Sequence, residues 1–410
     1  MDKTIVFYCI LFILIGEFIL ATVMNYLNAQ RFKDPIPSEL KDVYNTEEYH
    51  KSQAYKLTNY KFGIITSIFS LTLILVFLFF DGFAWVDDVA QSQSDNMILQ
   101  ALIFFGIVMI GSDILNIPFS YYKTFVIEEK FGFNKTTKST FLIDKLKQWA
   151  MTIVVGGGIL SLVIWFFQWA ESNFWLYTWA LITLFTLVLN LFYSKLIVPL
   201  FNKQEPLEAG SLKEKIENYA AQVGFDLQHV FVINGSKRST KANAYFSGFG
   251  KEKRVTLYDT LINDLEEEEI VAVLAHEVGH YKRKHIIYNL TTSILLTGFM
   301  LFLLSLFINN PEVSLAIGVD RPSFHAALIG FGILYSPISE ITGIIMNHFS
   351  RKFEYQADNF AKNTYAATPL VTSLKKLSKN SLSNLTPHPA YVFMHYSHPP
   401  LIDRIRNLKS

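Results

Sequence analysis

The chain has 410 residues, of which 51% are hydrophobic and only 17% charged, and it contains 36 phenylalanines. So little charge at this length is unusual for a soluble globular domain and favours a membrane protein. A net charge of +1 gives no sign of a nucleic-acid partner, and the single cysteine, Cys9, excludes a disulfide framework and a cysteine-based metal cluster.

Several apolar segments are long enough to span a membrane. A helix needs about 20 apolar residues to cross a hydrocarbon core of about 30 Å. Seven segments meet this requirement, at roughly 4–25, 62–84, 98–120, 150–168, 174–200, 286–308 and 324–347. We interpret the first as a retained span rather than a signal peptide, because its start is barely basic and no A-x-A-like site follows its apolar run.

Basic residues mark alternate connections between these segments. Lysine and arginine occur six times in each of 26–61 and 121–149 and are absent from 85–97. Because cytoplasmic loops are enriched in these residues, the alternation predicts an N-terminus outside the cell and seven crossings. The segment 201–285 and the tail after residue 348 are then both cytosolic.

The prediction divides the chain into four regions. The first five spans occupy 1–200, a cytosolic insert occupies 201–285, the last two spans occupy 286–347, and a cytosolic tail occupies 348–410. Acidic groups lie within three of the predicted spans, at Glu17, Asp113 and Glu340. Such groups are costly in lipid, so they indicate either paired structural groups or a wetted interior between the helices.

The insert is expected to be a small α+β unit. Ser211 with Glu214, and later Asp264 with Glu267, match capping boxes that would begin two helices. The sequence "VFVI" (230–233) is typical of a buried strand, and "NAYFSGFGKEKRVTLYD" (243–259) of two strands joined in a hairpin by a Gly/Lys turn. The second helix would turn four apolar side chains inward, namely Ile270, Val271, Leu274 and Val278.

That second helix carries the sequence "HEVGH". On a helix, His276 and His280 are one turn apart, so both imidazoles can meet one ion. Glu277 is poorly placed as a ligand but can reach a water on zinc and take its proton. An HExxH pattern alone is weak evidence, since two histidines on a solvated helix face would look the same, but a capped helix after a hairpin strengthens it.

A catalytic zinc needs a third protein ligand. Candidates after the motif are His285, Glu340, His348, Glu354, Asp358, His388, His395 and His398. His285 is too near the first pair to close a tetrahedron easily, and Glu340 lies inside the last span. In "RKFEYQAD" (351–358), Glu354 could bind zinc while Asp358 holds the free nitrogen of a ligand histidine. A solvated helix face remains the alternative for this pair.

Five separated motifs resemble one known family. "TFVIEEKFGFNKTT", "NAYFSG", "AHEVGH", "FEYQAD" and "SHPPLIDRI", arranged around seven spans, are similar to the type I integral-membrane CAAX prenyl proteases. The resemblance implies an all-α membrane domain whose seven transmembrane helices enclose a water-filled chamber, with a cytosolic α+β domain of zincin type. The implied activity is that of a zinc endopeptidase with one zinc ion per chain.

The resemblance also implies roles for individual residues. His276, His280 and Glu354 match its zinc ligands, and Glu277 matches its catalytic base. Asp358 matches a residue that acts either as support for a ligand or as a proton donor, and we favour support.

Two further positions match residues around the cleft. Asn243 matches a residue on the strand that pairs with substrate, and His398 matches one that stabilises the oxyanion. Without the resemblance, His398 would carry little weight, because "HPP" in a tail is usually a turn.

The expected partners are a peptide or a lipidated C-terminal protein substrate and membrane lipid, with no nucleic acid and no partner subunit. The short 309–323 loop and the ending "RNLKS" favour a bacterial inner membrane over the endoplasmic reticulum. Two alternatives remain: a broader quality-control metalloprotease, whose relatives have fewer spans, and a non-catalytic seven-span transporter or receptor, which would have no need of Glu277.

Overall fold

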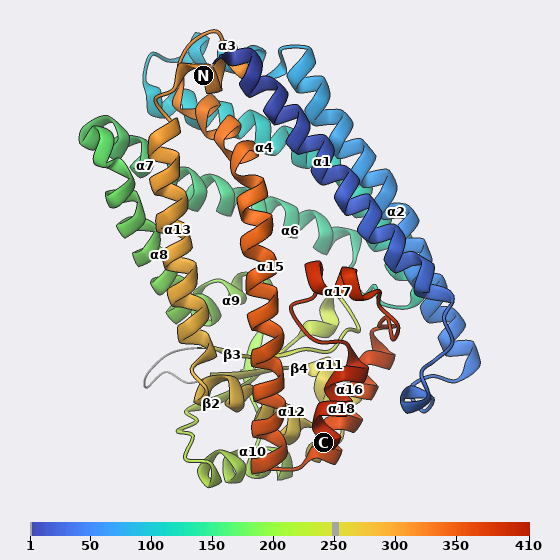
Figure 1. The fold of residues 1–410 in the computed structure, drawn as a ribbon. Helices are drawn as coiled ribbons and strands as arrows, with labels where there is room; N and C mark the ends of the chain where they lie inside the picture. Colours follow the sequence, from blue (N-terminus) through green and yellow to red (C-terminus); the bar gives the residue numbers. More distant parts are fainter. Residues whose placement is uncertain (1, 248–253) are drawn as a thin grey trace.

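The computed structural model describes residues 2–247 and 254–410. The predicted turn of the 243–259 hairpin falls on residues 248–253, which lie outside the described residues. Long apolar helices make up one part of the molecule, and a mixed cap lies at one end of them (Figure 1).

All seven predicted spans fall on apolar helices. In the described residues, six stretches are long and apolar enough to cross a membrane. One of them, Lys138–Leu196, holds two of the predicted spans, which are separated at η5 (Glu171–Asn173). The helices are α1 (Lys3–Gln30), α2 (Thr46–Phe79), α4 (Met97–Tyr122), α6 (Lys138–Met151) continued through η4 (Thr152–Gly156) into α7 (Gly157–Ala170), α8 (Phe174–Leu196), α13 (His285–Phe307) and α15 (Phe324–Thr364). The prediction of a helical multi-pass membrane protein is confirmed.

Short elements connect these helices at both ends. Beyond the end opposite the cap lie α3 (Gly82–Gln93) and α14 (Pro311–Ala316). The cap and its connections hold η1 (Arg31–Lys33), η2 (Ser38–Leu40), η3 (Lys123–Glu128), α5 (Glu129–Phe131), α9 (Val198–Phe201), α10 (Ser211–Gln222), η6 (Gly235–Lys237), α11 (Asp259–Asp264), α12 (Glu267–Lys282), α16 (Ala367–Asn380), α17 (Pro389–His395) and α18 (Leu401–Lys409).

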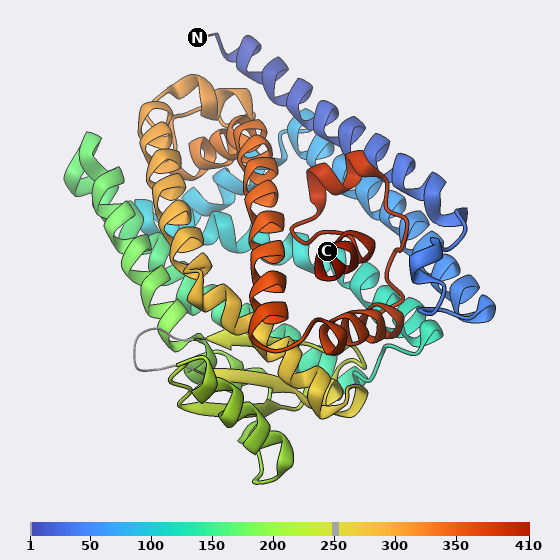
Figure 2. The same cartoon turned by 60° about the horizontal axis from the view of Figure 1, so that its bottom comes forward.

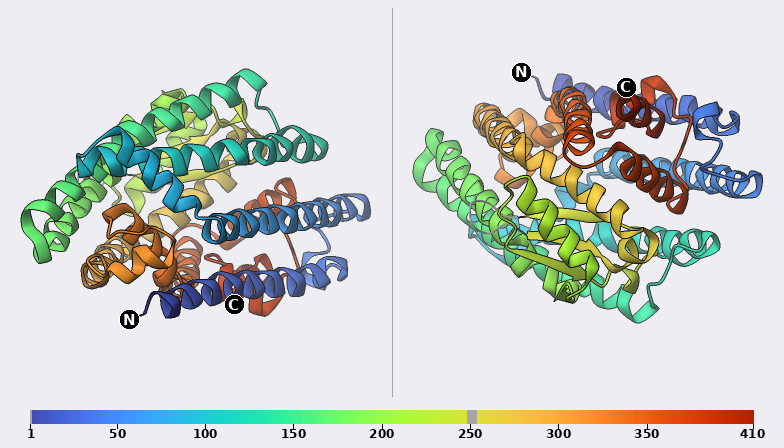
Figure 3. Two further views of the ribbon diagram at one scale, coloured as in Figure 1. Left: turned by 90° about the horizontal axis from the view of Figure 1, so that it is seen from above. Right: turned by 90° about the horizontal axis from the view of Figure 1, so that it is seen from below.

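The apolar helices spread apart between the two ends. α1 and α2 lie on one side and α7 and α8 on the other, in the views from the side, from above and from below (Figures 1 and 3). Only 6 to 17% of each apolar window is buried, whereas three buried clusters lie at the ends of the helices. The helices therefore bury side chains against one another mainly near their ends. The C-terminal segment, in red, lies between α15 and the blue helices α1 and α2 (Figure 2).

The polar groups predicted inside the spans have different surroundings. Glu17 accepts a hydrogen bond from Ser336 at 2.5 Å, and Asp113 pairs with Lys145 at 2.7 Å. Glu340 is exposed. Two of the three acids are thus satisfied by neighbouring helices, as the cost of an unpaired charge in lipid requires.

Within the described residues the cap holds a four-stranded sheet. Its strands are β1 (Gln204–Pro206), β2 (His229–Ile233), β3 (Ala244–Ser247) and β4 (Arg254–Tyr258), in the order β1-β2-β4-β3. β3 and β4 pair antiparallel with Ala244 opposite Leu257, which confirms the predicted hairpin, and β2 pairs parallel with β4. β3 is therefore an edge strand of this sheet.

Both predicted capping boxes are wrong. Ser211 is the first residue of α10, and the N-cap of this helix is Gly210. The Ser211 hydroxyl donates to Glu267 and does not cap the helix. α12 is capped by Glu266 and Glu269, which exchange side-chain and backbone hydrogen bonds. Asp264 ends α11, and Leu265 after it is extended. The N-cap of α12 is therefore Glu266, two residues beyond the predicted cap Asp264. The predicted apolar face of α12 is confirmed, since Ile270, Val271, Leu274 and Val278 are at most 1% exposed.

Candidate metal centre

The site forms where α12 crosses α15. Gly279 lies at the closest approach, where an added Cβ would stand 3.1 Å from the Cα and carbonyl oxygen of Ala357. A side chain here would need α15 to move by a few tenths of an ångström, so the absence of a Cβ allows this close approach of the two helices. The contact brings the histidines of α12 against the acidic residues of α15. The predicted span 324–347 and the helix of 351–358 are one continuous helix, α15.

Three potential ligands lie together at this crossing. In the described part of the chain, ligand atoms of His276, His280 and Glu354 lie within 4.8 Å of one another. The two Nε2 atoms are 3.1 Å apart, and the Glu354 carboxylate is 3.4 Å from His276 Nε2 and 3.3 Å from His280 Nε2. Glu354 is 4% exposed. Within the described residues its buried Oε2 has no hydrogen-bond donor, although Nη1 of Arg404 lies 3.4 Å away. A buried carboxylate whose Oε2 faces His276 and whose Oε1 faces His280 fits a metal ion with nitrogen and oxygen ligands.

A buried carboxylate supports His276 from behind. Asp358 is 0% exposed, and its Oδ1 accepts from His276 Nδ1 at 2.8 Å. Arg404 of α18 donates to both oxygens of Asp358, at 2.6 and 2.9 Å. Because both oxygens are engaged and Asp358 does not line the cleft, the geometry favours support over proton donation.

The same carboxylates favour positive charge at His276. Burial lowers the pKa of the His276 imidazole, but the hydrogen bond to Asp358 and the nearby Glu354 carboxylate outweigh burial and raise this pKa to about 9. Surroundings that stabilise a proton on this ring also stabilise a cation bound to it.

The ligand group opens onto a cleft of about 730 Å³. Glu277 and His398 both line this cleft, and His398 Nε2 lies 3.2 Å from Glu354. Glu277 is half-buried and has no hydrogen bond or ion pair within residues 2–247 and 254–410. α15 supports the segment that leads to His398, because Arg351 donates to the Val392 carbonyl oxygen at 3.1 Å.

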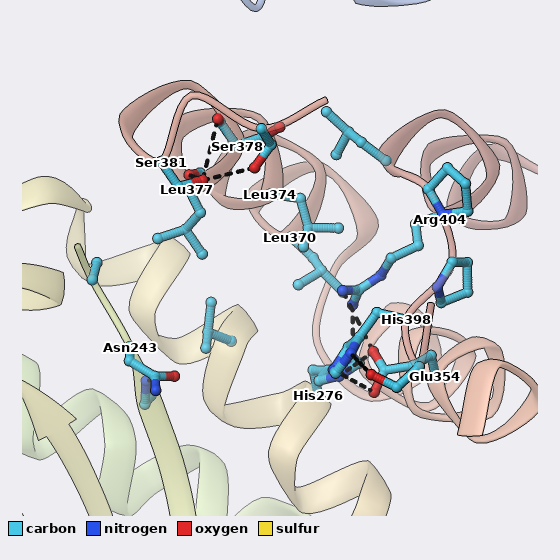
Figure 4. A pocket seen from close by; sticks show the side chains of 18 of the residues that line it. Asn243, His276, Glu354, Leu370, Leu374, Leu377, Ser378, Ser381, His398 and Arg404 are labelled. Carbon is cyan, nitrogen blue, oxygen red and sulfur yellow. Dashed lines mark hydrogen bonds and ion pairs between the residues drawn. The ribbon is translucent and has the colours of Figure 1, made fainter. Parts of the chain in front are cut away.

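The cleft has two different walls beyond the ligand group. On one side, Asn243 and Ala244 at the start of β3 line it, and the Asn243 side chain accepts from the Ala244 amide at 2.9 Å. On the other side α16 contributes Leu370, Leu374 and Leu377 (Figure 4). The cleft thus lies between a sheet edge and an apolar helix face.

Sequence reasoning missed three residues of the site. Arg404 lies within the quoted motif "SHPPLIDRI", but no role was assigned to it. His285 was considered only as a ligand, and Gln356 was not considered. Gln356 lies about 200° around α15 from both Glu354 and Asp358, so it is not on their face, and no local pattern pointed to it.

These features together are those of an integral-membrane metallopeptidase, with three residues that could hold a metal ion and an adjacent carboxylate in a cap on apolar helices.

Comparisons with known proteins specify this class further. Residues 25–203 match the model of the CAAX prenyl protease N-terminal region with five membrane helices, and residues 206–410 match peptidase family M48. CAAX prenyl protease 1 homologs of Oryza sativa subsp. japonica and Homo sapiens are 36% and 33% identical, over 98% and 92% of this chain and 96% and 89% of theirs. The crystal structure of S. mikatae Ste24p is similar with a TM-score of 0.93 and 33% identity, covering 99% of both chains. The chain belongs to peptidase family M48, in the CAAX prenyl protease group.

Proposed function

We propose that the protein is a zinc endopeptidase that cleaves peptide bonds near the C-terminus of prenylated CAAX proteins. The named activity of the relatives supports this substrate class. The observation that carries the proposal is the trio His276, His280 and Glu354, with Glu277 beside it on an open cleft. Glu354 Oε2 lies 3.4 Å from both His276 Nε2 and Arg404 Nη1 and accepts no hydrogen bond from the described residues, which suits a ligand of a cation.

His276, His280 and Glu354 would hold the zinc ion. Zinc supplies Lewis acidity, which polarises a substrate carbonyl and makes water a stronger nucleophile at neutral pH. Asp358 holds the His276 ring through Nδ1, which would leave Nε2 available as the ligand atom.

Two cleft residues would act on the reacting groups. Glu277 takes the proton of the attacking water and later passes it to the leaving amine, as general base and then general acid. His398 donates to the negative charge that develops on the carbonyl oxygen, since its Nε2 already lies 3.2 Å from a ligand carboxylate.

The substrate would bind as an extra strand along β3. An edge strand offers unpaired backbone groups to an extended peptide, and Asn243 stands at its start to bind the peptide backbone. The leucines of α16 across the cleft suit aliphatic side chains such as those that follow the cysteine of a CAAX sequence.

The metal assignment is tested by elemental analysis of purified variants. Glu354→Ala should lose most of the bound zinc, whereas Glu340→Ala on the same helix should keep it. Full zinc in Glu354→Ala would show that Glu354 is not a ligand and would reject the proposed site. Loss of zinc in Glu340→Ala would show that a different acid binds the ion.

The substrate class is tested with matched farnesylated and unlipidated CAAX peptides. We expect cleavage of both peptides at the same bond, near the C-terminus, with a lower KM for the farnesylated peptide. Cleavage scattered through unrelated unfolded proteins, with no preference for the C-terminal region, would favour a broad quality-control protease.

The cap would face the cytosol, as the distribution of basic residues predicts. In a Cys9→Ser background, Asp95→Cys at the far end should react with an impermeant maleimide in intact cells. Glu214→Cys in the cap should react only after the membrane is opened. The reverse pattern would place the active site outside.

A further inference from the structure

A hydrogen-bonded chain leads from α15 to the outer nitrogen of His280. Gln356 Oε1 lies 2.8 Å from His285 Nε2, and His285 Nδ1 lies 3.0 Å from His280 Nδ1. His285 is 2% exposed, and its ring stacks on Phe353 with centroids 4.2 Å apart and planes at 12°. Packing and two hydrogen bonds therefore hold the His285 ring in one orientation.

A sharp turn brings His285 to this position. α12 ends at Lys282 and α13 begins at His285. Between them, Lys284 has left-handed backbone angles, φ 61° and ψ 25°. Such angles are uncommon outside glycine, so the surrounding contacts must support the turn. The turn folds His285 back against the last turn of α12.

The order of donors and acceptors from Gln356 through His285 to His280 determines which ring nitrogens carry protons. The side-chain oxygen of Gln356 can only accept, so His285 carries its proton on Nε2. Nδ1 of a neutral His285 then accepts, and His280 must donate from its own Nδ1. This leaves the Nε2 lone pair of His280 directed at His276 and Glu354. In the reverse order His280 would carry its proton on Nε2 and could not bind a metal ion through the atom that faces His276 and Glu354.

The two histidines of the motif are thus supported in different ways. His276 donates to Asp358, a carboxylate that also pairs with Arg404. His280 has a neutral ring and a neutral amide behind it instead. In both arrangements an acceptor holds the proton on Nδ1, so Nε2 is the atom available to a metal ion.

We propose that His285 and Gln356 are positioning residues, which hold His280 in the tautomer that binds the metal ion. The inference rests on the proposed zinc site and adds the group that orients its second histidine. Neither residue touches the substrate or the ion, because both act through the His280 ring.

The test is the zinc affinity of the metal-stripped, full-length protein, measured in detergent by competition with a chelating dye. His285→Leu removes the acceptor and should weaken zinc binding by about 10- to 100-fold, as loss of a group behind a ligand typically does. His285→Asn should recover most of the affinity, because its side-chain oxygen can stand close to the place of Nδ1 and accept from His280. A purely structural role would give no such difference between variants of equal thermal stability.

Two further variants keep the test decisive if His285→Leu does not fold. Gln356→Leu should weaken zinc binding in the same direction, and Gln356→Glu should preserve it, because a carboxylate is also an acceptor. Phe353→Leu is the matched control, since it removes the stacked ring and leaves both hydrogen bonds, and its zinc affinity should stay close to that of the parent.

Failure of this inference can be separated from failure of the zinc site. Suppose that Glu354→Ala loses zinc while His285→Leu and Gln356→Leu bind it as tightly as the parent. The zinc site then stands, and the proposed positioning of His280 by His285 and Gln356 is wrong. If Phe353→Leu loses as much affinity as His285→Leu, packing rather than proton placement explains the effect. If Glu354→Ala keeps its zinc, the proposed site itself is wrong.

Discussion

Two buried histidine–aspartate pairs lie near opposite ends of α15. At the cap, His276 Nδ1 meets Asp358 Oδ1 at 2.8 Å, and at the far end His325 Nε2 meets Asp87 Oδ1 at 2.5 Å. Asp358 and His325 both belong to α15, about 50 Å apart at a rise of about 1.5 Å per residue. The polar contact is the same at both ends, but the second ring nitrogen has different surroundings.

The second nitrogen of His276 faces other ligands, whereas that of His325 faces none. His276 Nε2 lies near His280 and Glu354, beside an open cleft. His325 Nδ1 is buried and has no described hydrogen-bond partner, and its ring packs on Phe104 with centroids 4.4 Å apart. A histidine–aspartate pair is therefore no sign of chemistry by itself, and access to the second nitrogen decides its role.

The far-end pair joins elements that close the end of the helices. Asp87 belongs to α3, and it also accepts from Gln91 at 2.7 Å and lies 3.3 Å from Arg321. Asp87 and His325 are 2% and 1% exposed. We therefore expect stability to depend on this pair and catalysis to depend on the other, and the following variants test that division.

The largest effect is expected at the base of the cap site. Glu277→Gln keeps the shape of the side chain but cannot take a proton, so turnover should fall by about 10²- to 10⁴-fold or more. Zinc content and melting temperature should not change. Turnover of CAAX peptides near the parent rate would show that the HExxH helix has a structural role only.

His398→Ala should have the next largest effect on activity. Loss of a donor to the developing oxyanion typically lowers kcat by about 10²- to 10³-fold. Because His398 is 64% exposed, its removal should leave the fold and the zinc content as they were. A change confined to KM would assign His398 to substrate binding instead.

The reverse pattern is expected at the far end. Asp87→Ala removes the partner of His325 and one partner of Arg321, which should lower the free energy of unfolding by about 3 kcal/mol. The variant should melt at a lower temperature in detergent. Well below that temperature its zinc content and kcat should match those of the parent. Loss of activity in the folded variant would mean that the two ends are coupled.

Asp358→Asn should have the smallest effect of the four. Asparagine can still accept from His276 Nδ1, but it supplies no negative charge to the ring or to Arg404. Zinc affinity should fall by about 10- to 100-fold, which chelator competition would measure. An unchanged affinity together with a large fall in kcat would favour the alternative role of Asp358 as a proton donor.

Much of the architecture was predictable because its signals are local. Apolar runs of about 20 residues predicted the spans, and the spacing of apolar residues predicted the buried face of α12. Strand patterns predicted β2 and the hairpin of β3 and β4. Both capping boxes failed because a short motif cannot show which nearby residue begins a helix. Asp264 ends α11, and Glu266 caps α12 instead.

The sequence by itself determined the pair of histidines on one helical turn and the carboxylate beside them, because a spacing of four residues fixes their relative positions. The tertiary structure alone decided which distant groups complete the site. Glu354, Asp358 and Arg404 reach His276 only because α12 packs against α15 at Gly279 and α18 folds back onto them. It also decided that His325 and His276, each paired with an aspartate, have different surroundings at the second ring nitrogen. Burial and the neighbours of the second nitrogen are products of packing, and no local pattern encodes them.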